Sequence, residues 1–397
     1  MIGLTTRTAR GVRVLLLLCA LGASARAVAA QVATAPGATA PVTTAGIVRA
    51  ANAFLATLDT AQRRRVLYAF DDDVQRRRWS NFPTGFVPRG GISLRQMNAT
   101  QRAAALALVS TALSRRGYEK VQQIMEADEV FKATDRGPPG GGRPGGGPPR
   151  GGPPGTPPGG PPGGGPPPGG PPGGGRPGRG AAMFGRDLYF IAILGTPSER
   201  TPWMLQYGGH HLALNLTVAG DRGVLTPSLT GAQPARYTVN GRTVRPIGEE
   251  SDQALALLNT LDASQRAQAV LNYRVPDLVL GPGQDGKTIQ PEGLPASAMT
   301  ARQRALLLDL IGVWAGIVHE REAATRMAEL RADLDGTYFA WSGPTTGEAG
   351  QNISAYYRIQ GPHLVIEYAP QRDEPTNHVH TIYRDPTNDY GRVLTAK

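Results

Sequence analysis

The chain has almost no cysteine. Its single cysteine, Cys19, lies in an apolar run near the N-terminus of the 397-residue sequence. Beyond that run the chain can form no disulfide bond and offers no thiolate metal ligand or thiol nucleophile. A protein of this length does not depend on disulfides, because it is large enough to bury a stabilising hydrophobic core.

The N-terminal apolar run is too short to span a bilayer. Arginines precede the apolar stretch 14–25, and small residues suited to cleavage follow at 27–30. This pattern is typical of a Sec-type signal peptide. We therefore expect residues 1–30 to be a signal peptide. The protein would be secreted or periplasmic, with no membrane anchor after cleavage.

The net charge of +11 comes mainly from two unusual segments. Four arginines lie in the signal region and four more in the Gly/Pro-rich tract 137–180, and without these eight the charge is +3. We therefore expect no specific nucleic-acid binding. The tract lacks the strict glycine period of collagen and cannot bury apolar surface. It is predicted to be a disordered insertion, and 31–45 a disordered lead-in.

Helical and strand patterns follow one another along the chain. Before the tract, apolar residues recur at helical spacing in 47–70, 93–113 and 118–131. After it come strand-like segments separated by turns such as Asn240-Gly241. Helices followed by antiparallel strands indicate the α+β class.

The same order returns in the second half of the chain. The frame Leu-x-x-Leu-Asp-x-x-Gln-Arg at 55–63 recurs at 258–266, and further matches follow in the same order. Each copy alone would expose an apolar face, so we expect an internally duplicated unit packed about a pseudo-twofold axis. The first repeat would span 46–245, including the insertion, and the second 246–397, both within one globular domain.

Chemically active side chains are concentrated near the C-terminus. His378 and His380 lie two residues apart in a predicted strand, so their imidazoles share a face and can meet on one metal ion. A second pair, His210 and His211, follows two glycines, and adjacent residues in a regular strand face opposite ways. His319 is expected to be an ordinary residue on the face of a long helix, 306–327.

These histidines predict a metal site. Three imidazoles, from His211, His378 and His380, would leave an open position on a catalytic zinc or copper ion, with His210 as a candidate fourth ligand. Nearby carboxylates could orient an imidazole or act as general base, a guanidinium could hold an anion, and a phenol could donate a proton. The candidates for these catalytic roles are Asp385, Asp389, Arg384 and Tyr390. The competing interpretation is structural: satisfied histidines, and an internal salt bridge of Arg384.

Motifs for several other chemistries are missing. The sequence contains no Gly-x-Ser-x-Gly elbow, Walker loop or His-Glu-x-x-His helix. The leading hypothesis is a metal-dependent enzyme, a hydrolase before an oxidoreductase, in which metal-bound water is the nucleophile. One alternative is a non-catalytic extracytoplasmic protein that binds a ligand or a metal. Another is a structural protein tethered by its Gly/Pro-rich tract. The residues do not identify a small-molecule or polymer substrate, or an oligomeric state.

The histidines lie in two longer motifs. The motifs are Gly208-Gly209-His210-His211-Leu212 and, more specifically, His378-x-His380-x-x-Tyr383-Arg384-Asp385-x-x-Asn388-Asp389-Tyr390-Gly391. They resemble motifs of the exported bacterial proteins grouped as domain of unknown function 3500. The resemblance covers the chain from about residue 47 to its end, apart from the Gly/Pro-rich tract. It implies that both histidine clusters are the regions to consider for function, and it implies no particular reaction, substrate or cofactor.

Overall fold

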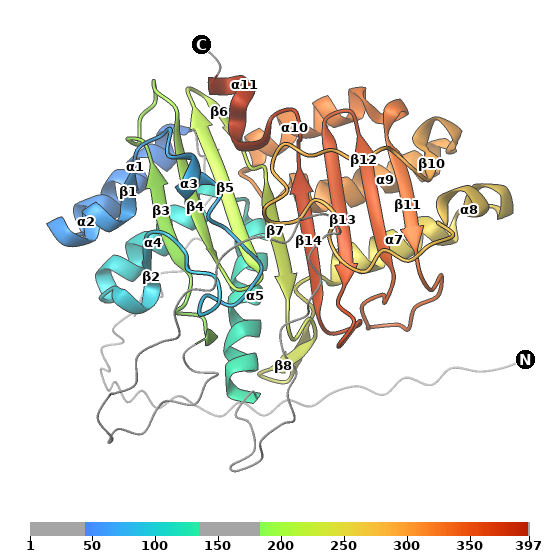
Figure 1. Ribbon diagram of the computed structural model, residues 1–397, viewed down its shortest axis with the longest axis horizontal. Coiled ribbons are helices and arrows are strands. Elements are labelled where there is room, and N and C mark those ends of the chain that lie inside the picture. The colour runs from blue at the N-terminus through green and yellow to red at the C-terminus, as the bar shows by residue number, and fades with distance from the viewer. Residues whose placement is uncertain (1–43, 135–182, 396–397) are drawn as a thin grey trace, which may run out of the picture. The chain divides into compact units, whose positions relative to one another are not determined.

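The computed structural model describes residues 44–134 and 183–395 (Figure 1). The predicted signal peptide and Gly/Pro-rich insertion lie outside these ranges, as does the lead-in up to residue 43. The described residues form helices and a mixed sheet, which confirms the α+β class. Among them, no helix combines the length and apolar character that a bilayer crossing requires.

A 12-stranded sheet forms the centre of the fold. Its order is β1-β3-β4-β5-β7-β14-β13-β12-β11-β10, with β2 beside β3 and β6 beside β5. All neighbours are antiparallel except β1 and β3. The hairpin of β8 and β9 is a separate sheet. The strands are β1 (Leu67–Tyr68), β2 (Ile92–Ser93), β3 (Phe190–Leu194), β4 (Trp203–Gly209), β5 (Leu212–Ala219), β6 (Arg222–Val224), β7 (Ser228–Ala232), β8 (Tyr237–Val239), β9 (Arg242–Val244), β10 (Leu294–Pro295), β11 (Tyr338–Ser342), β12 (Tyr356–Gly361), β13 (Leu364–Pro370) and β14 (Val379–Arg384).

The two faces of the sheet are covered differently. The longer helices lie behind the sheet in the view of Figure 1 and share the main hydrophobic core with it. Segments 71–91 and 271–293 cross the other face, where Trp79 and Leu278 pack against Ile382 of β14. The helices are α1 (Thr44–Ala56), α2 (Thr60–Val66), α3 (Asp73–Arg76), α4 (Ala99–Ala112), α5 (Arg115–Thr134), α7 (Gly248–Asn259), α8 (Ala263–Ala269), α9 (Ala301–Ala315), α10 (Glu320–Ala332) and α11 (Arg392–Thr395).

The repeated sequence frame forms equivalent local structures. Asp59 and Asp262 each cap a helix in a capping box, with Gln62 and Gln265 as the reciprocal partners. Each of these glutamines then accepts a hydrogen bond from a glutamine of the next long helix, at 2.7 Å in the first half and 2.8 Å in the second. Such paired contacts are expected of a duplication. The duplication and its pseudo-twofold axis stay predictions.

The predicted long helix around His319 is wrong. Helix α9 ends at Ala315, and α10 begins at Glu320. The break has a tertiary cause: the backbone N–H of Ser114 donates to the carbonyl of Ile317 at 3.0 Å, so this segment pairs with the chain between α4 and α5. His319 is consequently not on a helix face. It is the buried N-cap of α10, and its ring lies 3.2 Å from Glu322.

Strands β7 and β14 join the two halves of the sheet. Their antiparallel pairing sets Gly231 opposite His380. Strand β14 ends at Arg384, immediately before Asp385-Pro386. The histidine pair at its start therefore lies where strands from both halves of the chain meet.

Candidate metal centre

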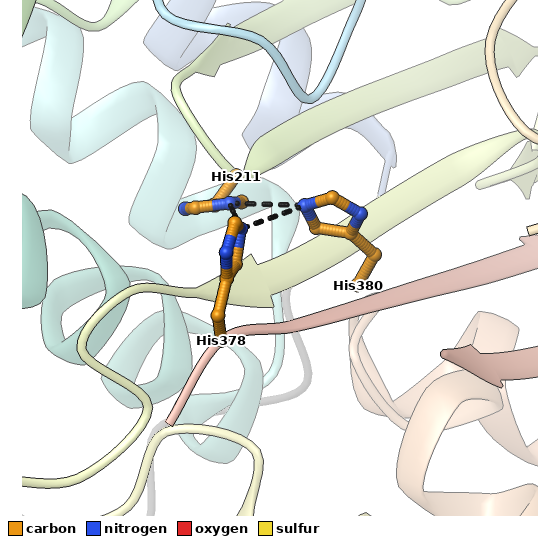
Figure 2. A group of neighbouring side chains, drawn as sticks. All are labelled: His211, His378 and His380. Carbon is orange, nitrogen blue, oxygen red and sulfur yellow. Dashed lines mark hydrogen bonds between the residues drawn. The ribbon is translucent and has the colours of Figure 1, made fainter. Parts of the chain in front are cut away.

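Three histidines from distant parts of the chain converge beside the β7–β14 pair. His211 lies in the turn between β4 and β5, His378 immediately precedes β14, and His380 lies within it. Figure 2 shows their rings meeting through the Nε2 atoms. The Nε2 atom of His211 is 3.0 Å from that of His378 and 3.1 Å from that of His380, and the last two are 3.2 Å apart. The predicted three-histidine constellation is thus assembled and could hold a metal ion.

The backbone of His211 differs from the predicted strand conformation. His210 and His211 are the two turn residues of the β4–β5 hairpin, and His211 has a φ of 57°. A left-handed conformation is uncommon outside glycine and costs on the order of 1–3 kcal/mol. Because of this conformation, the His211 side chain does not follow the alternating side-chain directions of a strand. Gly231 makes room for this ring, because an added Cβ there would lie 3.3 Å from its Cδ2.

The spacing of the nitrogens fits a metal ion. The three Nε2 atoms form a nearly equilateral triangle, with corners about 1.8 Å from its centre. Zinc binds imidazole nitrogen at about 2.0–2.1 Å, so the three nitrogens lie close enough together to hold one ion. Three histidine ligands would leave one position of a four-coordinate zinc ion for water or substrate.

The number of N–H groups and lone pairs on the three imidazoles also favours a bound cation. A neutral imidazole has one N–H and one lone pair, so three mutually contacting nitrogens cannot all be paired donor to acceptor. The Nδ1 atom of His378 lies 3.1 Å from both carboxylate oxygens of Asp373, so Nδ1 carries the proton and Nε2 a lone pair. At least one of the three contacts then lacks a hydrogen bond, whereas a metal ion would use all three lone pairs.

The third ligand candidate has two polar neighbours. The Nδ1 atom of His380 lies 3.4 Å from Asp277 and 3.1 Å from the side-chain amide of Asn81. Asp277 and Asp373 are about half exposed, at 52% and 59%. The centre therefore lies close to the surface on the side of these carboxylates.

Burial keeps the imidazoles of His378 and His211 neutral. It lowers the pKa of His378 to about 4, and the neighbouring His380 lowers this pKa further while Asp373 raises it. The pKa of His211 is also far below its ordinary value, because of burial and then the neighbouring imidazoles. At neutral pH both rings therefore offer lone pairs, the form that a metal ion requires.

His210 belongs to a second group behind the centre. Its Nδ1 atom lies 2.7 Å from Asp128, and its ring lies against that of His211 at a tilt of 36°, with centroids 3.7 Å apart. Asp128, His210 and His211 come close enough to be considered as metal ligands. The short contact between His210 Nδ1 and Asp128 already uses the His210 nitrogen on that side. The structure thus directs His210 towards Asp128 rather than towards His378 and His380.

The four predicted catalytic residues lie at the other end of β14. His380 and Arg384 are four residues apart, about 13 Å along a strand that rises ~3.3 Å per residue. The buried Arg384 guanidinium binds Asp389 at 2.8 Å and Asp285 at 2.9 Å, and the hydroxyl of Tyr390 donates to Asp285 at 2.6 Å. This is the internal salt bridge of the competing interpretation.

Asp385, the remaining candidate, binds Arg326 at 2.9 Å. It lines a cavity of about 260 Å³ between β6 and α10. No histidine of the centre lines this cavity, so the cavity and the metal centre are separate sites.

Several residues of the centre were not foreseen from the sequence. Asp373 could have been found, because it precedes His378 by five residues in the same turn. Asn81, Asp277 and Asp128 carry no local signal. The position of Asp277 depends on the anchoring of the segment that carries it. The backbone N–H groups of Val279 and Leu280 donate to the buried carboxylate of Glu367 at 2.8 and 2.7 Å.

Comparison with known proteins identifies the family. The chain matches the family described as Protein of unknown function (DUF3500) over residues 40–392. This match covers most of the chain, which therefore belongs to that family. No curated protein and no solved structure matches the chain.

Proposed function

We propose that this DUF3500 protein is a metalloprotein in which His211, His378 and His380 bind one zinc or copper ion. The observation that supports the proposal most strongly is the triangle of Nε2 atoms, 3.0–3.2 Å on each side. Without a cation, such a triangle brings unpaired lone pairs together. The second shell also suits a metal site, because carboxylates commonly orient ligand imidazoles through their second nitrogen.

We further propose that the bound ion activates water for hydrolysis. A metal ion lowers the pKa of its water towards neutrality and polarises a substrate carbonyl or phosphoryl oxygen. The exposed carboxylates of Asp277 and Asp373 are the nearest groups able to take the proton that this water releases. The oxygen of this water would bond to the electrophilic atom as the bond to the leaving group breaks, and the proton taken by Asp277 or Asp373 would pass to the leaving group.

A metal-binding role without catalysis is the second candidate. It is favoured by the position of Asp389, Arg384 and Tyr390, which bind one another or Asp285 at the far end of β14. Under this candidate the same histidines sequester or carry the ion. Either role suits an exported protein, and we propose secretion or periplasmic localisation from the signal-like residues 1–30.

Metal analysis of the purified full chain tests the proposal. After exposure to zinc and, separately, to copper, and after removal of free ion, we expect about one equivalent per chain. The variant His378→Ala/His380→Ala should retain none. His363→Ala is the matched control, because this half-exposed histidine lies outside the centre, and it should bind as the wild type does. Absence of both metals from the wild type would refute the proposal.

Hydrolysis and simple metal binding are separated by an activity screen. The zinc-loaded wild type would be assayed with chromogenic esters, phosphoesters and peptide amides beside the double variant. Turnover that requires the histidines supports the hydrolase. A full complement of zinc without turnover of any substrate class favours the binding role.

A further inference from the structure

Each ligand imidazole of the centre is associated with a carboxylate, but one association is indirect. Asp373 and Asp277 contact His378 and His380 directly. The Nδ1 atom of His211 has no hydrogen-bond partner among the described residues. A metal-binding histidine usually has such a partner, which fixes the orientation of its ring. The His211 ring must therefore be held in another way.

The neighbouring His210 ring occupies the corresponding place. It lies against the His211 ring at a tilt of 36°, and Asp128 on α5 holds it through its Nδ1 atom. The hydroxyl of Tyr189 lies 2.9 Å from the same carboxylate and 3.0 Å from the His210 carbonyl oxygen. Asp128, His210 and His211 are 2%, 4% and 1% exposed, so these contacts are shielded from water. Shielding makes the charge-assisted contact stronger than an exposed one.

The same contacts hold a strained turn. His211 has a left-handed backbone, and the residues before it are fixed on both sides. The Tyr189 hydroxyl lies within hydrogen-bond distance of the His210 carbonyl, and Arg89 donates to the Gly209 carbonyl at 2.9 Å. A strained conformation persists only where its surroundings enforce it. The turn and the ring that it carries are thus held by Tyr189 and Arg89 as well as by the Asp128 contact from α5.

We propose that Asp128 and His210 are positioning residues that hold the His211 imidazole in its metal-binding orientation without contacting the ion. The inference rests on the proposed metal centre. Direct ligation by His210 is unnecessary in this arrangement, since its ring acts through its contact with the His211 ring and Asp128 acts through His210. Loss of either contact would allow the His211 ring to turn, and the centre would keep two ordered ligands.

The test compares the Asp128→Asn variant with the wild type, both loaded with cobalt(II). The visible absorption of cobalt(II) reports its coordination geometry, which a purely structural role of Asp128 would leave unchanged. We expect an altered spectrum and a metal Kd raised about 10–100-fold, the usual cost of removing an outer-shell partner. His210→Phe retains an aromatic ring but cannot bind Asp128, and it should show the same changes.

Glu250→Gln is the matched control. Glu250 on α7 is another fully buried carboxylate, and it pairs with Lys120 of α5. Its loss should destabilise the chain without altering the cobalt spectrum. A wild-type spectrum and Kd in folded Asp128→Asn and His210→Phe would overturn the inference while leaving the metal centre intact. Failure of the wild type itself to bind metal would instead reject the proposed function.

Discussion

The Nε2 atoms of His211 and His378 lie 3.0 Å apart, although 167 residues separate them along the chain. The contact depends on two structures that form independently: the β4–β5 turn of the first half and the start of β14 in the second. Antiparallel pairing of β7 with β14 brings them together. A metal ion at this point would cross-link the two halves of the sheet, so metal binding and stability should be coupled.

The carboxylates beside the ligand imidazoles should control metal affinity. We expect Asp373→Asn and Asp277→Asn each to raise the zinc Kd about 10–100-fold, because the imidazole loses the charged partner that orients it. Competition titration with a chromophoric chelator measures this change. Asp221→Asn removes a carboxylate that is 74% exposed from a salt bridge with Arg321 outside the centre, and it should leave the Kd unchanged. Equal affinity in all three variants would argue against an outer-shell role.

Gly231 should be required for both the sheet and the centre. A Cβ at this position would lie 2.6 Å from the Val379 carbonyl oxygen and 3.3 Å from the His211 ring. We expect Gly231→Ala to lower the unfolding temperature and to weaken zinc binding at least tenfold, because β7 and the His211 ring must both move. Gly312→Ala, where the nearest atom is 3.8 Å away, serves as the control in thermal unfolding and zinc titration. An unchanged zinc affinity in Gly231→Ala would contradict this expectation.

The metal-free protein should lose stability in mild acid. The folded chain lowers the pKa of His378 from 6.5 to about 4, so protonation favours the unfolded state. This stabilisation is complete above the unfolded pKa of 6.5 and is lost as the pH falls through about 4. For His378 alone the loss is on the order of 3 kcal/mol. Urea unfolding with a chelator at several pH values measures it, and the same pH dependence in His378→Asn would exclude this histidine as the cause.

The Arg384 cluster should act on stability rather than on metal binding. Asp389→Asn leaves a buried guanidinium with one fewer charged partner, and breaking a buried pair costs about 3–5 kcal/mol. We expect a lower unfolding temperature and an unchanged zinc Kd, since the cluster lies at the far end of β14. Calorimetry and zinc titration of the same sample separate the two effects. If a hydrolytic substrate is found, loss of turnover in the folded, zinc-loaded variant would instead support a catalytic role.

Local patterns in the sequence predict much of the fold. Helical periodicity predicts helices in 47–70, 93–113 and 118–131, where α1, α4 and α5 form, and the strand predicted at His378 and His380 corresponds to β14. The two-residue spacing of His378 and His380 was sufficient to predict that their imidazoles meet. These features depend on neighbours within one or two turns or strand rises, so the sequence alone determines them.

The rest was decided by tertiary structure. His319 is an N-cap rather than a helix-face residue because the backbone of a distant segment pairs with the break before it. Asp277 and Asp128 reach the centre from a segment that crosses the sheet and from a helix behind it. Neither position has a sequence signal, because such contacts depend on how whole elements pack.

The histidine triangle depends on both the local sequence and the tertiary structure. The sequence determined which residues could serve as ligands and placed two of them on one face of a strand. Only the folded chain decided that His211 would adopt a left-handed turn and join them, while His210 would bind Asp128. The physical reason is that a strained turn is stable only when surrounding packing and hydrogen bonds enforce it.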